Sequence, residues 1–239
     1  MRRFYAPVQN FEKNEVFLDE NETRHLRDVL RLHVGEEINV FDGESREFLC
    51  EVVKIGKKRA DLHVISEISP TAPESPLDLI LTPALLKGEK FDLVIQKAVE
   101  LGVRRLIPLI TYRCDVKLKD RGSKIERWRR IALEAAKQSG RARLMQINEH
   151  MDFSVLLKSE KPSGMVMFSE RGGDTFDKIS TEEEIIAITG PEGGWEDSEI
   201  EVAREAGAAI ITLGGRVLRA ETAAVSIAAI LQHRFGDIN

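Results

Sequence analysis

Two glycine-rich loops contain the residue types best suited to binding a small ligand. The first reads Thr189-Gly190-Pro191-Glu192-Gly193-Gly194-Trp195. Its glycines and proline allow main-chain N–H and C=O groups to approach a ligand closely, although the same composition also suits a plain tight turn. The loop has neither the GxGxxG pattern of dinucleotide sites nor the Gly-Lys-Ser/Thr of a phosphate-binding P-loop, which excludes both of those classes here.

The second loop, LGGRVLRAETAA, covers 213–224 and leads directly into an apolar helix. Glu221 and Thr222 fall in the first turn of that helix, where side chains can cap the helix or contact a ligand. The alternative is that Arg219 and Glu221 form a simple surface ion pair.

Both loops belong to a region in which short apolar strands alternate with helices. We expect strands at 77–82, 104–110, 165–168, 185–189 and 208–213, and helices at 90–101, 123–139, 197–206 and 221–233. Ser123 is expected to cap its helix, with Glu126 at the capping-box position. Such alternation predicts a mostly parallel sheet covered on both faces. Ligands of these sheets bind beyond the carboxyl ends of the strands, here the loops after Phe168, Thr189 and Leu213.

The first seventy residues follow a different pattern. Strands are expected at 36–41, 48–55 and 60–68, with one helix at 20–32 that places Leu26, Val29 and Leu30 on its apolar face. Short strands around a single helix predict a small β-barrel. Three prolines within 70–76 then mark a linker. We therefore expect an N-terminal barrel domain over 1–69 and an α/β domain over 77–239.

The composition of the 239 residues excludes several classes of protein. At 42% hydrophobic and 31% charged residues, the chain can fill a packed core, so a wholly disordered protein is excluded. The apolar runs fall far short of a membrane span, and the first residues do not resemble a signal peptide. The two cysteines, Cys50 and Cys114, cannot form a disulfide framework or a four-cysteine zinc site, so we expect a cytoplasmic protein without a metal.

Charge is distributed unevenly along the chain. The formal net charge is -5, yet 113–143 holds 11 basic residues against four acidic ones. A local excess of this size attracts phosphate, and it also suits a solvated charged face.

Several sequence blocks, in order along nearly the whole chain, resemble the RsmE family of methyltransferases. They are VLR at 29–31 after His25, KGEK at 87–90, IQKAVELGV at 95–103, AAKQSGR at 135–141, GPEGG at 190–194, LGGRVLRAETAA at 213–224 and QHRFGD at 232–237. The sequence departs from the family pattern at Leu144-Met145, where the family often has Val-Pro, and at Ala220, where it often has threonine.

The resemblance implies a PUA-like RNA-binding barrel followed by a SPOUT domain with a trefoil knot, and a homodimer. It also implies a reaction: methylation of uridine N3 in small-subunit ribosomal RNA with S-adenosylmethionine (SAM) as cofactor. The substrate would be free rRNA or the assembled 30S subunit.

For that reaction the loss of the N3 proton spreads negative charge over O2 and O4 of the base, which a fixed guanidinium would stabilise. The catalytic candidates are Arg219, Arg141 and Glu221, with Arg143 and Glu192 as further possibilities. His25 is expected to be an RNA contact or a structural residue. The cofactor would lie against Phe168, Ser169, Thr189, Gly190, Glu192, Gly193, Gly194, Leu213, Gly214, Val217, Leu218, Thr222 and Ala223. RNA would be held by Arg2, Arg3, Arg24, Arg27, Arg31, Arg113 and Arg143.

Three other functions compete with this interpretation. The chain could be a SPOUT methyltransferase of another RNA or of a ribose 2′-hydroxyl. It could be a ribosome-assembly factor that binds RNA without turnover. It could also be a metabolic nucleotide-binding enzyme, against which the barrel and the basic segment argue.

Overall fold

The computed structural model describes residues 2–116, 121–159, 164–180 and 183–238. The chain forms two compact units. The first comprises Met1–Glu74 and Leu133–Leu144, and the second comprises Ser75–Ala132 and Met145–Asn239. No described helix is both long enough and apolar enough to cross a membrane.

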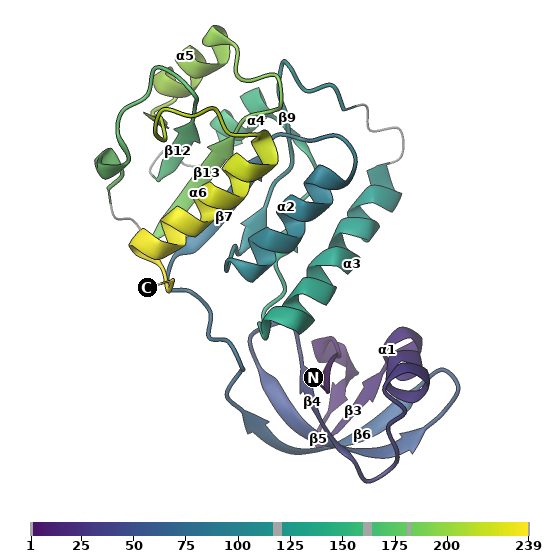
Figure 1. Ribbon diagram of the computed structural model, residues 1–239. Helices are drawn as coiled ribbons and strands as arrows, with labels where there is room; N and C mark the ends of the chain where they lie inside the picture. Colours follow the sequence, from purple (N-terminus) through teal and green to yellow (C-terminus); the bar gives the residue numbers. More distant parts are fainter. Residues whose placement is uncertain (1, 117–120, 160–163, 181–182, 239) are drawn as a thin grey trace. The chain divides into compact units, whose positions relative to one another are not determined.

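A six-stranded sheet in the order β1-β4-β5-β6-β3-β2 forms the first unit (Figure 1). Its strands are β1 (Arg3–Tyr5), β2 (Phe11–Glu12), β3 (Glu15–Leu18), β4 (Glu37–Phe41), β5 (Glu47–Ile55) and β6 (Ala60–Ile68). Only the β1–β4 pair is parallel. Register shifts at Leu49/Cys50 and Val52/Lys54 interrupt the β5–β6 ladder, and such bulges bend a sheet around its core. The expected small barrel is therefore a curled sheet around Phe4, Leu18, Leu26 and Leu62.

The helix expected at 20–32 is shorter and less regular than its pattern suggests. Helix α1 (Glu20–Arg24) is capped by Asp19, whose carboxylate accepts a hydrogen bond from the Glu22 amide at 2.9 Å. A π-helical turn (His25–Val29) follows. The wider turn changes which side chains face inward, so Leu26 is fully buried while Val29 is 64% exposed. The prediction that Val29 lies on the buried face is wrong for this reason.

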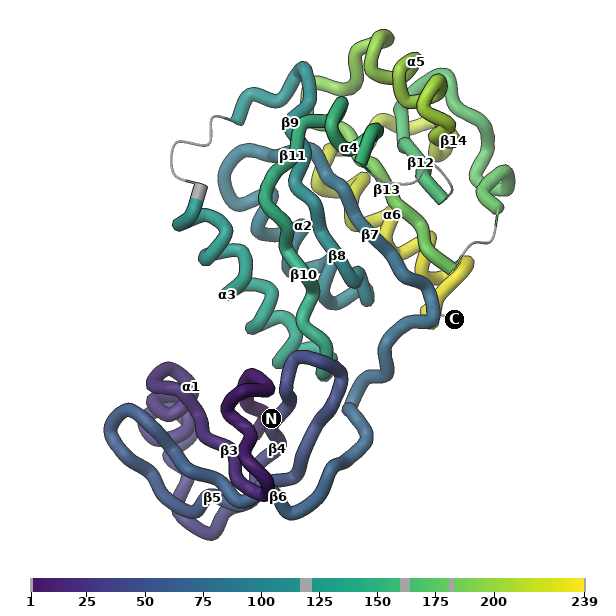
Figure 2. The backbone as a smooth tube through the Cα atoms, turned by 180° about the vertical axis from the view of Figure 1, so that it is seen from behind, coloured from purple at the N-terminus to yellow at the C-terminus, as the bar shows by residue number. Residues whose placement is uncertain are grey.

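The second unit contains a parallel sheet in the order β10-β8-β7-β13-β12-β14, with β7 and β13 at its centre (Figure 2). Its strands are β7 (Asp78–Pro83), β8 (Arg105–Leu106), β10 (Gln146–Ile147), β12 (Met165–Phe168), β13 (Glu184–Thr189) and β14 (Ala209–Ile211). A separate parallel pair joins β9 (Leu109–Ile110) to β11 (Met151–Asp152). The single strand expected at 104–110 is thus split, because Pro108 has no N–H with which to continue the ladder.

Helices cover both faces of this sheet, as the alternating pattern predicts. They are α2 (Glu89–Glu100), α4 (Phe153–Ser159), α5 (Asp197–Glu205) and α6 (Ala220–Phe235). Helix α3 (Arg121–Ser139) packs Trp128 on Phe91 of α2, and its residues from Leu133 on belong to the first unit. In Figure 1, α2 and α6 run side by side over one face. On the other face, Ile186 and Ile188 share a core with Phe153 of α4 and Ile200 of α5. The capping box expected at Ser123 is wrong, because α3 already includes Arg121.

Candidate cofactor site

A cavity of about 490 Å³ opens at the carboxyl ends of the central strands of the second unit. Its walls come from the segment that begins at Phe168 after β12, from the Thr189–Trp195 loop after β13, and from 213–221 before and at the start of α6. This is the edge at which the strand order predicts a ligand. The volume falls in the range of small-molecule and cofactor sites, about 300–1,000 Å³.

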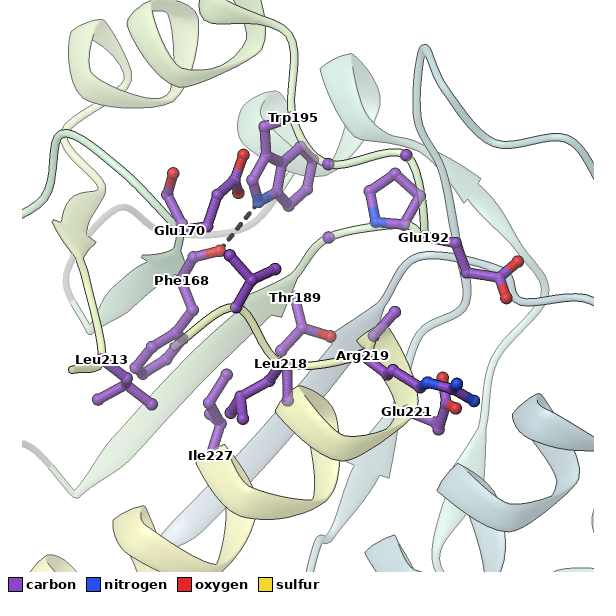
Figure 3. Close-up of a pocket in the computed structure, with 18 of the residues that line it drawn as sticks. Phe168, Glu170, Thr189, Glu192, Trp195, Leu213, Leu218, Arg219, Glu221 and Ile227 are labelled. Carbon is purple, nitrogen blue, oxygen red and sulfur yellow. Dashed lines mark hydrogen bonds between the residues drawn. The ribbon is translucent and has the colours of Figure 1, made fainter. Parts of the chain in front are cut away.

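Trp195 fixes the shape of the glycine loop. Its ring is 1% exposed and lies 5.2 Å, centroid to centroid, from that of Phe153. Its indole N–H donates to the carbonyl oxygen of Phe168 at 2.9 Å, which joins the loop after β13 to the end of β12 (Figure 3). Gly190 lies against this ring: a Cβ at that position would be 2.8 Å from Nε1. Only glycine fits there without displacing the tryptophan.

Two ion pairs hold the same loop from its other side. Lys90 of α2 pairs with the carboxylate of Glu192. Arg113 donates to Glu196 at 2.7 Å and to the carbonyl oxygen of Gly193 at 2.9 Å. Glu192 therefore stabilises its own loop, in line with the structural alternative to a direct catalytic role.

The cavity has an apolar side and a charged side. In Figure 3, Phe168, Leu213 and Ile227 lie on one side, whereas Arg219 lies beside Glu221 on the other, with Glu192 above them. The apolar side suits a flat heteroaromatic ring, and the charged side suits a group whose charge changes during a reaction.

Glu221 has one carboxylate oxygen that needs a partner. Its Oε2 is buried and, within the described part of the chain, makes no hydrogen bond. A buried carboxylate oxygen without a partner is costly, which makes Glu221 a candidate for a role in binding or catalysis. The residue lies in the first turn of α6, where the helix dipole favours its negative charge.

The cavity brings together most of the predicted cofactor residues. Arg219 and Glu221 line it. Eleven of the predicted cofactor residues line it as well: Phe168, Ser169, Thr189, Gly190, Glu192, Gly193, Gly194, Leu213, Val217, Leu218 and Ala223. Gly214 and Thr222 are not among the lining residues.

The sequence interpretation missed several residues that also line the cavity: Lys90, Glu170, Pro191, Trp195, Arg216, Ala220 and Ile227. Pro191 and Trp195 lie inside the quoted glycine loop, and Lys90 lies in the KGEK block. Their positions in those blocks were the signal that could have found them.

Comparisons with known proteins agree with this geometry. A family model described as an RNA methyltransferase domain matches 73–232, and one described as an RNA methyltransferase PUA domain matches 18–65. A curated Ribosomal RNA small subunit methyltransferase E of Mesomycoplasma hyopneumoniae is 39% identical, over 94% of this chain and 96% of that protein. The protein of the same name from Synechocystis is 34% identical, over 93% of this chain and 74% of that protein. The chain belongs to the ribosomal RNA small subunit methyltransferase E family.

A solved structure of the family is similar over the full length. The methyltransferase E of Neisseria gonorrhoeae, solved bound to S-adenosyl methionine, has a TM-score of 0.91 and 34% identity, and the match covers 100% of both chains. The family resemblance and the α/β architecture with a PUA-type N-terminal region are thereby confirmed.

Arg141 and Arg3, predicted for catalysis and for RNA, are instead part of a buried ionic network in the first unit. Arg141 is 4% exposed and donates to Glu74, with an Nη2–Oε2 distance of 2.6 Å. The Arg3 side chain donates to Glu47 at 2.9 and 3.1 Å and to the carbonyl oxygens of Ala136 and Arg141 at 3.0 and 2.8 Å. With these donors engaged inside the unit, the geometry gives both arginines a structural role. Arg141 is also absent from the cavity lining.

The other predicted RNA contacts differ in how free they are. Arg24 and Arg31 are exposed, Arg2 pairs with Glu36 at 2.7 Å, and Arg27 pairs with Asp28 at 2.6 Å. Arg143 is half-buried, and Arg113 supports the glycine loop as described above. RNA binding by these residues stays a prediction. Of the basic segment, Lys117, Lys119 and the Arg121 side chain lie outside what the structure describes.

Proposed function

We propose that this chain transfers a methyl group from SAM to N3 of a uridine in small-subunit ribosomal RNA. The observation that carries the proposal is the cavity at the strand ends, whose apolar side faces a charged side formed by Arg219 and Glu221. The family's curated members are named as ribosomal RNA small subunit methyltransferases, and the Neisseria relative was solved bound to SAM.

The cavity fits SAM in its volume and in its chemistry. The adenine ring would lie on the apolar side between Leu213, Leu218 and Ile227, within reach of main-chain groups. Gly190 has no side chain, so it can lie close to the Trp195 ring without narrowing the site. Bound SAM would supply a methyl group already activated by its sulfonium. The protein would then have to position the uridine next to that methyl group and to accept the N3 proton.

Arg219 and Glu221 would prepare the uridine. The Arg219 guanidinium is exposed on the loop before α6, where it can lie beside O2 or O4 of the base and stabilise their developing negative charge. The Glu221 carboxylate lines the cavity, its Oε2 has no hydrogen-bond partner among the described residues, and it would accept the N3 proton. Positioning of the two reactants would do the remaining work.

The proposal extends to the organisation and setting of the protein. A PUA-like RNA-binding domain over 1–69 and a knotted SPOUT domain over 77–239 would act in the cytoplasm as a homodimer, on free rRNA or on the assembled 30S subunit. Support for a second copy comes from Val217 and Leu218, which line the cavity and are 85% and 38% exposed. Water-exposed apolar side chains around a ligand site favour a covering partner.

Labelled-methyl transfer tests the proposal. The acceptors are small subunits and naked rRNA from cells that lack the endogenous modification, and the Arg219→Ala variant is run in parallel. We expect label in RNA with the wild type, a large loss of kcat in the variant, and SAM binding by both in calorimetry. SAM binding without transfer to either acceptor would point to another RNA substrate or to a binding factor, and would overturn the proposal.

A further inference from the structure

Two further cavities continue from the cofactor cavity along one side of the second unit. The first, of about 350 Å³, shares Pro191, Glu192 and Gly193 with the cofactor cavity, so the two lie on either side of one loop. We call it the flanking cavity. The second, of about 430 Å³, shares Leu85, Asp115 and Val116 with the flanking cavity. We call it the distal cavity. Each of these neighbouring cavities shares lining residues with the next, and we call the three together the track.

Tyr112 lines the flanking cavity with a ring that is 80% exposed. An aromatic side chain left in water gives up the free energy that its burial would bring, so this exposure needs a reason. The backbone that bears the ring is held in place: the Tyr112 amide donates to Glu199 Oε1 at 2.9 Å, and the Cys114 amide donates to the Thr111 carbonyl oxygen at 3.1 Å across the turn.

The turn that bears Tyr112 is fixed to the loop of the cofactor cavity. Arg113, the next residue, donates to the carbonyl oxygen of Gly193 at 2.9 Å. The turn that bears Tyr112 is thus held next to the glycine loop of the cofactor cavity, where the target base would enter.

The charges along the track change from one cavity to the next. In the flanking cavity, Asp115 is paired with Lys87 at 2.8 Å and Glu192 is paired with Lys90, so the acidic groups there are already neutralised. Such walls suit the uncharged face and edge of a nucleobase. The distal cavity is lined by Lys87 and Arg127, which pair with Asp115 and Asp92, by Glu89, and by Lys124, whose ammonium group suits a phosphate.

We propose that Tyr112 is a stacking platform for the nucleobase next to the methylated uridine, and that the strand continues past Lys124. Single-stranded RNA is recognised by splaying its bases onto aromatic faces, and a ring stacks on any base. This inference rests on the proposed function: it adds a specificity-determining residue to the same reaction.

The test combines a protein change with an RNA change. Tyr112→Ala removes the ring, and Tyr112→Phe is the matched control that keeps it. Small subunits are reconstituted with rRNA that is intact or abasic at the nucleotide on one side of the target uridine, each side in turn. Steady-state methyl transfer gives KM and kcat, and calorimetry gives the Kd for SAM.

We expect Tyr112→Ala to raise KM for intact subunits by about fivefold or more, the scale of one lost base stack, with kcat and the SAM Kd unchanged. Tyr112→Phe should stay within about twofold of the wild type on the same scale. One of the two abasic substrates should raise the KM of the wild type as much as the Tyr112→Ala change raises it on intact subunits. On that substrate, Tyr112→Ala should have no further effect on KM.

A KM for Tyr112→Ala within twofold of the wild type on intact subunits would overturn the inference. So would a Tyr112→Ala change that raises KM by the same factor on intact subunits and on both abasic substrates. Failure of the proposed function looks different, because the wild type itself would then transfer no methyl group to intact subunits.

Discussion

Replacing Gly190 by alanine should damage the cofactor cavity by steric overlap alone. The φ angle of Gly190 is not in the left-handed region, so alanine suits the backbone itself. The new Cβ, however, would be 2.8 Å from Nε1 and 3.0 Å from Cε2 of Trp195. The tryptophan cannot move aside freely, because it is 1% exposed, packs on Phe153 and donates to the Phe168 carbonyl oxygen.

The size of the effect follows from those contacts. Overpacking a well-packed site costs about 1–3 kcal/mol. Displacing the indole from the Phe168 carbonyl oxygen leaves a buried acceptor unpaired, which costs about 1–3 kcal/mol more. A loss of about 2 kcal/mol lowers the Tm of a chain of this size by roughly 4–8 °C. If about 1.4 kcal/mol of this free energy destabilises the cavity conformation that binds SAM, the affinity for SAM drops tenfold.

Calorimetric titration with SAM and thermal unfolding measure both effects. Gly215→Ala is the matched control: Gly215 lies in the other glycine loop, outside the left-handed region, and no atom lies within 4 Å of its added Cβ. We expect the control to bind SAM as the wild type does. Wild-type affinity and Tm in Gly190→Ala, or equal damage in both variants, would refute the reasoning.

Three further predictions concern catalysis, stability and thiol chemistry. Arg219→Lys should lower kcat by about 10²-fold, as removal of a charge-stabilising donor does, with the SAM Kd nearly unchanged; an unaltered kcat would remove Arg219 from the chemistry. Glu47→Ala should lower the free energy of unfolding in urea by about 3–5 kcal/mol, because it leaves the buried Arg3 guanidinium unpaired. Breaking the more exposed Arg2–Glu36 pair should lower the free energy of unfolding by less than about 1 kcal/mol. Equal losses of stability from breaking this pair and from Glu47→Ala would contradict the argument from burial. Burial raises the pKa of the Cys50 thiol to about 12, so at pH 8 it should stay protonated and resist alkylation until urea unfolds the chain; rapid labelling of the native protein would argue against this.

The sequence predicts the cofactor cavity well because its determinants are local. An apolar run that ends in glycines specifies both a strand and the loop beyond it, and parallel strands bring such loops to one edge. The loops after Phe168, Thr189 and Leu213 meet there as expected. Residues within these loops were therefore assigned without knowledge of the pairing of the strands.

Contacts between distant segments could not be predicted in the same way. Charge counts could not show that Arg3 pairs with Glu47, 44 positions away, or that Glu192 pairs with Lys90, 102 positions away. The assignments of Arg3 and Arg141 rested on residue type, and the sequence could not show that both are buried in ion pairs, because a buried arginine has the same sequence signal as an exposed one. The π-helical turn after Arg24 likewise has no periodicity that distinguishes it from an ordinary helix.

Nucleoside analysis of the modified RNA tests the central claim most directly. Small subunits from cells without the endogenous modification would be incubated with the protein and SAM, and the RNA would be digested and separated by liquid chromatography with mass detection. A cavity that stabilises a uridine anion through Arg219 and takes its proton at Glu221 predicts 3-methyluridine as the new nucleoside. A methyl group found instead on a ribose 2′-hydroxyl or on another base would contradict the claim, because neither product forms from a uridine N3 anion.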